Sequence, residues 1–137
     1  MTKRVNNCDV VRVALRTGED TQNATGSFRF EYGTPHAITR GYGYHLITWH
    51  HARMIETFNR RRENITAVIW SYQTPIAWRD GDEWITPDAR YSATTGSKHL
   101  PYVNIPNRVT IPHDTGHDYE SFLSRKSIYT GKTVIAA

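Results

Sequence analysis

An Asp-Gly pair at residues 80 and 81 is the feature that most constrains how this chain can fold. It stands between two short segments rich in apolar and aromatic residues, and Asp-Gly is a preferred loop for a two-residue β-hairpin. We therefore predict a hairpin over residues 76–85 with Asp80 and Gly81 in its loop. The residues that face each other in that register are complementary. Arg79 and Asp82 have opposite charges, and the pairs Ala77–Trp84 and Ile76–Ile85 are apolar.

Several other segments have the pattern of short strands. Residues 27–32 alternate apolar and polar side chains with a period of two, which is typical of a half-buried strand. Residues 65–70 are a β-branched and apolar run, which is typical of a buried strand. Further strands are expected at 9–16, 91–95, 103–105 and 109–111.

One segment has helical spacing. Trp49, Ala52, Ile55 and Phe58 recur at intervals of three residues, so we predict one main helix over about residues 49–62. The fold class expected from these elements is α+β, with an antiparallel or mixed sheet of five to seven short strands and this helix packed on one face.

The size and composition of the chain suit a single folded domain over residues 1–137. Apolar residues make up 38% and charged residues 22%, a balance that argues against global disorder. Aromatic residues make up 12%, which favours sheets because flat rings pack well on a pleated surface.

The cysteine content and the absence of long apolar runs bear on location. Cys8 is the only cysteine, so no disulfide can form within the chain and a reducing compartment is expected. No apolar stretch approaches the ~20 residues that span a bilayer, and the first residues lack the apolar core of a signal peptide. We expect a cytoplasmic location, in the host cell if the protein is phage-encoded, and no membrane partner.

Two runs in the middle of the chain form a recognisable pattern. They are Ser71-Tyr72-Gln73-Thr74-Pro75-Ile76-Ala77 and Tyr91-Ser92-Ala93-Thr94-Thr95-Gly96-Ser97-Lys98-His99. Over residues 71–99 the chain resembles small uncharacterised proteins of actinobacterial phages and other mobile elements, which have Ser-Tyr-x-Thr-x-Ile-Ala and then Tyr-Ser-x-Thr-Thr-Ser-Lys-His. Gly96 interrupts the Thr-Thr-Ser run here. The resemblance implies a phage-type source and carries over no activity.

The second of these runs is a candidate anion-binding turn. Its hydroxyl groups, its backbone beside a glycine and the charge of Lys98 are suited to hold a phosphate. The residues are Ser92, Thr94, Thr95, Ser97, Lys98 and His99. The structural alternative is a threonine-rich strand whose hydroxyls pair across a sheet and which ends in a solvated turn.

A cluster of arginines is a candidate phosphate contact. Arg53 and Arg60–Arg62 fall near the end of the predicted helix, and the net charge of +4 permits an anionic partner. Aromatic residues that can stack on unpaired bases are Tyr42, Tyr44, Trp70 and Trp78. The structural alternatives are cations that favour the negative end of a helix dipole, and aromatic rings that fill the core.

Metal binding and catalysis have weak support in the sequence. His113 and His117 are spaced as zinc ligands on a helix, but Pro112 and Gly116 disfavour a helix there. No nucleophile-elbow motif is present. We therefore expect no metal, no cofactor and no catalytic residue.

Three functions remain open from the sequence. The first is a phage-type accessory protein that binds nucleic acid through a basic surface. The second is a protein-binding inhibitor of a host or defence factor, which predicts an exposed aromatic patch. The third is a nucleotide-binding pocket or enzyme site at the 92–99 turn, which requires Lys98 and His99 to point into one concave site. The oligomeric state is left open.

Overall fold

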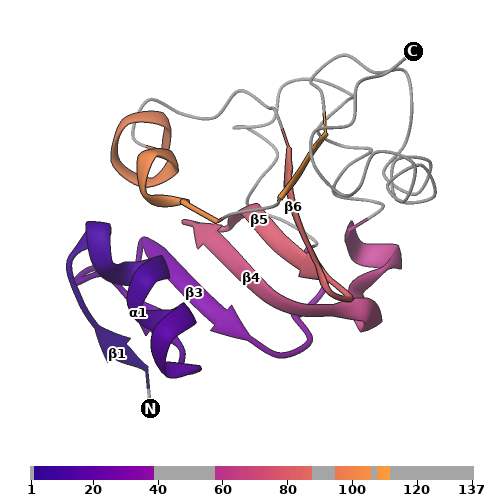
Figure 1. The fold of residues 1–137 in the computed structure, drawn as a ribbon, viewed down its shortest axis with the longest axis horizontal. Helices are drawn as coiled ribbons and strands as arrows, with labels where there is room; N and C mark the ends of the chain where they lie inside the picture. The colour runs from indigo at the N-terminus through magenta and orange to yellow at the C-terminus, as the bar shows by residue number, and fades with distance from the viewer. Residues whose placement is uncertain (1, 39–57, 88–94, 106–107, 112–137) are drawn as a thin grey trace.

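A seven-stranded mixed sheet forms the framework of the protein (Figure 1). The computed structural model describes residues 2–38, 58–87, 95–105 and 108–111. The strands lie in chain order across the sheet: β1 (Lys3–Arg4), β2 (Thr21–Gln22), β3 (Phe28–Tyr32), β4 (Ile65–Ser71), β5 (Thr74–Asp80), β6 (Glu83–Pro87) and β7 (Val109–Ile111). Neighbours from β2 to β6 are antiparallel, whereas β1 is parallel to β2 and β7 is parallel to β6. The fold is α+β, as predicted.

The segment predicted as a strand at 9–16 is instead a helix, α1 (Val10–Thr17). As a strand it would place two of its four small apolar residues on the same face as Arg12 and Arg16. A helical period instead gathers all four on one buried side: Val10, Val11, Val13 and Ala14. The helix ends at Gly18, which has a φ of 72° and donates its backbone N–H to the Ala14 carbonyl at 2.9 Å.

The other predicted helix is described only at its end. Residues 49–57 lie outside the described residues, and residues 58–60 are helical. The main helix of the described chain is therefore α1. Single turns complete the structure: η1 (Asn7–Asp9), η2 (Arg62–Asn64), η3 (Thr95–His99, a π-helical turn) and η4 (Leu100–Tyr102).

The predicted hairpin forms, but its register differs from the predicted one. Asp80 pairs with Glu83, and Arg79 pairs with Trp84 rather than with Asp82, so the loop is Gly81–Asp82. Gly81 has a φ of 60°, which the first loop position of a type II′ turn requires. Asp80 stays in the strand because its buried carboxylate binds Arg61.

The sheet is covered on both faces. On one face α1 packs against Phe28 and Phe30 of β3, and Val103 and Ile105 join the same core cluster. On the other face Phe58 packs edge-on against Trp70 and Trp78. A strand was expected at residues 103–105, but these residues pair with no strand. They follow η4, and the side chains of Val103 and Ile105 are buried in the core.

The remaining strand predictions have different outcomes. The strands at 27–32, 65–70 and 109–111 are confirmed as β3, β4 and β7. For the strand expected at 91–95, residues 91–94 lie outside the described residues, and Thr95 belongs to η3 instead.

Candidate functional site

The two halves of the 71–99 pattern meet inside the protein. His99 is 1% exposed and its Nδ1 lies 2.6 Å from the Ser71 Oγ, while its ring stacks on Phe28 at a centroid distance of 4.7 Å. Burial lowers the pKa of His99 from its usual 6.5, which favours the neutral ring. This contact therefore links η3 to the end of β4. It also gives Ser71 and His99, one from each run of the 71–99 pattern, a structural role.

The predicted anion-binding turn is divided by this arrangement. Ser97 and Lys98 are exposed, whereas His99 points into the core. The side chains of Lys98 and His99 therefore lie in different environments, whereas the hypothesis of a pocket at this turn required both to point into one concave site. Ser92 and Thr94 lie outside the described residues, and Thr95 is described only as part of the η3 backbone.

The predicted arginine cluster is partly taken up by structural contacts. Arg61 binds the buried carboxylate of Asp80 with two hydrogen bonds, at 2.7 and 3.0 Å. Arg62 donates to the backbone carbonyl of Pro35 at 3.2 Å. Arg60 is exposed, and Arg53 lies outside the described residues.

The aromatic residues expected to stack on bases are largely unsuited to that role. Trp78 is 1% exposed and presents no ring face to a ligand, and Trp70 is nearly as well buried. Tyr42 and Tyr44 lie outside the described residues. The exposed large aromatic side chains of the described chain are other tyrosines, which the sequence did not single out: Tyr32, Tyr72 and Tyr102.

Tyr102 forms one wall of a cleft of about 590 Å³, which we call the N-terminal cleft. The cleft lies between the segment that precedes α1, the turn from β2 to β3, and η4. Its lining combines apolar groups with the amide side chains of three asparagines. The lining residues are Val5, Asn6, Asn7, Cys8, Asn23, Ala24, Thr25 and Tyr102.

Hydrogen bonds between side chains fix the shape of the N-terminal cleft. Asn23 donates to the Asn7 Oδ1 at 2.9 Å and to the Ser27 Oγ at 3.0 Å, and its own Oδ1 accepts the backbone N–H of Phe28 at 3.1 Å. The exposed amide of Asn6 has no hydrogen-bond partner within the described part of the chain. Hydrogen bonds thus hold the side chains of Asn7 and Asn23 in the cleft, whereas the Asn6 amide is available to a ligand.

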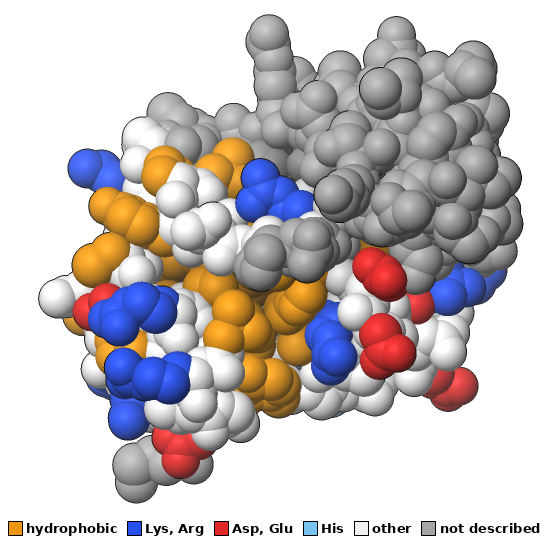
Figure 2. Space-filling model, viewed as in Figure 1, with side chains coloured by type: hydrophobic (Ala, Val, Ile, Leu, Met, Phe, Trp, Pro, Cys, Tyr) orange, Lys and Arg blue, Asp and Glu red, His pale blue; other side chains and the backbone are white. Residues whose placement is uncertain are grey.

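Two exposed cationic residues neighbour the lining of the N-terminal cleft. Arg4 donates to the Ala24 carbonyl at 3.2 Å, which places its exposed guanidinium at the rim. Asn7 donates to the Lys98 carbonyl at 3.3 Å, which places the backbone of Lys98 next to the cleft lining, and the Lys98 residue is exposed. Figure 2 shows further Lys and Arg side chains gathered over α1 and β1. The exposed cations of these two elements are Lys3, Arg4, Arg12 and Arg16.

The described residues also bear on metal binding and on membrane insertion. No three His, Cys, Asp or Glu side chains in this part of the chain gather as a metal site would require. No described helix is both long enough and apolar enough to cross a membrane.

Comparison with known proteins places the chain in a family without an assigned function. Residues 30–104 match the model of a family of unknown function (DUF8033), which is more than half of the chain, and the protein belongs to this family. No curated protein and no solved structure matches it.

Proposed function

We propose that the protein is a small phage-type accessory protein that acts in the cytoplasm and binds single-stranded nucleic acid in the N-terminal cleft. The observation that carries this proposal is Tyr102, a tyrosine 40% exposed on the wall of a cleft that three asparagines also line, with Arg4 and Lys98 next to lining residues. Single-strand binders combine an aromatic stacking surface with cations that follow the backbone.

Each part of the N-terminal cleft has a role in this proposal. The ring of Tyr102 stacks on an unpaired base, and the Asn6 amide hydrogen-bonds to a base edge. Arg4 and Lys98 neutralise neighbouring phosphates, and the cations over α1 and β1 attract the strand from a distance. A single strand fits better than a duplex because stacked and paired bases leave no ring face for Tyr102.

Fluorescence anisotropy with labelled single-stranded and duplex oligonucleotides of about 12 nucleotides tests this function. Loss of base stacking typically costs about 1–3 kcal/mol, so Tyr102→Leu should weaken single-strand binding about 5- to 150-fold. Tyr102→Phe keeps the ring and should bind like the wild type. Equal affinity of Tyr102→Leu and wild type, or a preference for the duplex, would refute the proposal.

A second candidate function, inhibition of a host or defence protein, is favoured by one observation. Figure 2 shows hydrophobic side chains exposed beside α1. Leu15 of α1 and Tyr32 of β3 are both exposed, and the Tyr32 hydroxyl donates to the carbonyl of Ala14 at 2.7 Å.

A pull-down from nuclease-treated host lysate tests the second candidate. One host protein should be retained by the wild type and lost with Leu15→Glu, because the substitution places a charge in the apolar surface. Equal capture by both proteins would count against it.

A further inference from the structure

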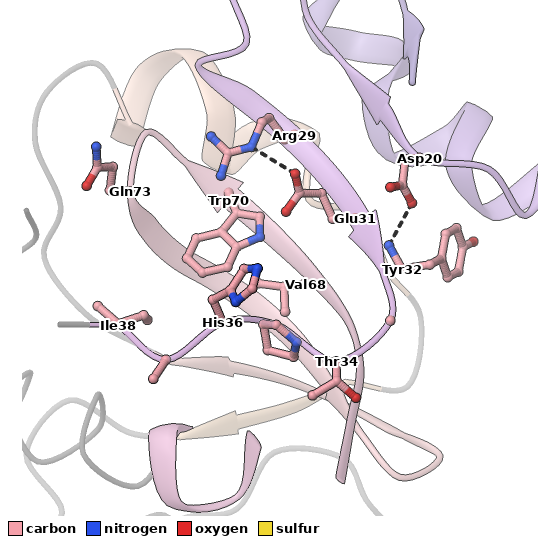
Figure 3. A pocket seen from close by; sticks show the side chains of 13 residues that line it. Asp20, Arg29, Glu31, Tyr32, Thr34, His36, Ile38, Val68, Trp70 and Gln73 are labelled. Carbon is pink, nitrogen blue, oxygen red and sulfur yellow. Dashed lines mark hydrogen bonds and ion pairs between the residues drawn. The ribbon is translucent and has the colours of Figure 1, made fainter. Parts of the chain in front are cut away.

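A second cavity lies on the sheet face opposite α1, away from the N-terminal cleft. It has a volume of about 580 Å³ and is formed over β3 and β4 beside residues 33–38 (Figure 3). Arg29 and Glu31 of β3 and Val68 and Trp70 of β4 line it. These residues alternate along their strands with the ones that pack under α1, so they project from the other face.

The cavity contains a buried donor that lacks a partner. Trp70 is 8% exposed, and its Nε1 has no hydrogen-bond acceptor among the described residues. Figure 3 shows the indole among the lining side chains, with its nitrogen directed toward the space between Glu31 and His36. Leaving a buried N–H unpaired costs about 1–3 kcal/mol, and native proteins rarely do so.

Two side chains already contact the Trp70 ring. The guanidinium carbon of Arg29 lies 5.5 Å from the ring centroid, and Phe58 packs against the ring edge-on at 6.2 Å. The N–H lies at the edge of the indole, and it is the hydrogen-bonding group that the ring offers to a ligand.

The charges of the lining disfavour an anionic ligand. Arg29 is neutralised by Glu31, whose Oε2 lies 3.4 Å from its Nε, and it also donates to the carbonyls of Gly26 and Tyr72. Asp20 adds a second carboxylate to the lining and accepts the backbone N–H of Tyr32 at 2.8 Å. With two carboxylates and one paired guanidinium, the cavity disfavours a phosphate or a carboxylate.

We propose that this cavity binds a small uncharged molecule that carries a carbonyl next to an N–H, as in the lactam edge of a nucleobase or in a carboxamide. The carbonyl oxygen accepts the Trp70 Nε1–H, and the ligand N–H donates to the Glu31 carboxylate. This site is separate from the N-terminal cleft and does not depend on nucleic-acid binding there.

Proton–nitrogen correlation spectra of the full ¹⁵N-labelled chain test the proposal. The chain has four tryptophans, and Trp70→Phe identifies the indole signal of Trp70 because that signal disappears. Uridine and nicotinamide are the lactam and carboxamide probes, and acetate and inorganic phosphate are the anionic ones. A saturable shift of the Trp70 signal with uridine alone would support a nucleobase ligand. The same shift with nicotinamide alone would support a carboxamide ligand.

Calorimetric titration of variants with the probe that binds provides the second readout. Trp70→Phe keeps an aromatic ring but lacks the N–H, so binding should weaken tenfold or more. Trp84→Phe is the matched control, since Trp84 packs on Phe30 and does not line the cavity. The proposal is overturned if neither amide probe shifts the Trp70 signal, if an anion shifts it as strongly, or if Trp70→Phe binds as tightly as wild type.

Discussion

Replacement of Arg61 by alanine should destabilise the protein and leave its binding surface intact. Arg61 and Asp80 join the start of η2 to the end of β5 through two hydrogen bonds. The Asp80 side chain is 5% exposed and that of Arg61 is 27% exposed. The variant therefore leaves a buried carboxylate without this cation.

The expected loss in the free energy of unfolding lies between the values for a buried and an exposed ion pair. Breaking a fully buried ion pair costs about 3–5 kcal/mol, whereas an exposed pair contributes about 0.2–1 kcal/mol. Solvent reaches Arg61, and Asp80 has further contacts, so we expect Arg61→Ala to lower the free energy of unfolding by about 2 kcal/mol.

Urea denaturation followed by tryptophan fluorescence measures this difference, because the indoles of Trp70 and Trp78 are buried in the native state. In the double variant Arg61→Ala/Asp80→Asn the carboxylate charge is gone, so part of the lost stability should return. A change of less than about 0.5 kcal/mol in Arg61→Ala, which is typical of surface substitutions, would refute the structural role of Arg61.

Two further predictions concern single positions. Because burial lowers the pKa of His99 below its unfolded value of 6.5, the unfolded chain binds a proton more readily, and stability should fall as the pH drops below about 6.5. His99→Asn keeps a hydrogen-bonding group near the Ser71 hydroxyl but does not titrate, so its urea midpoint should depend less on pH; an unchanged dependence would contradict the assignment. Gly81→Ala should cost about 1–2 kcal/mol in the same assay, since the added Cβ meets no atom within 4 Å and only the φ of 60° opposes it; a neutral result would place the hairpin loop elsewhere.

The sheet could be predicted because its signals are local. The alternation at 27–32 and the apolar run at 65–70 have strand patterns over their own lengths, and both are strands. Residues 10–14 misled the prediction because Val10, Val11 and Val13 have β-branched side chains that favour strands locally. The helix forms because it places these apolar side chains on one side, where burial against Phe28 and Phe30 stabilises it.

The sites could be predicted less well because they depend on contacts between distant residues. Lys98 and His99 are neighbours in sequence, but the contact of His99 with Ser71 sends their side chains to different environments. Arg61, which the sequence analysis assigned to phosphate binding, is likewise paired with Asp80. Asp80 belongs to β5, so the hairpin loop is residues 81–82 instead of 80–81. Of the predicted phosphate-binding residues that the structure describes, Lys98 neighbours the N-terminal cleft, through the hydrogen bond that Asn7 donates to its carbonyl. The assignment of residues 1–137 to one domain stays a prediction.

The salt dependence of single-strand binding tests the central claim most directly. Each phosphate neutralised on a single strand contributes about −0.7 to the slope of log affinity against log salt concentration. Arg4→Gln/Lys98→Gln should therefore reduce the magnitude of that slope by about 1.4 relative to wild type. The charge-matched control, Arg60→Gln/Arg79→Gln, should keep the wild-type slope. An unchanged slope in Arg4→Gln/Lys98→Gln, together with a reduced slope in the control, would contradict binding at the N-terminal cleft. That result would assign the phosphate contacts to Arg60 and Arg79 instead.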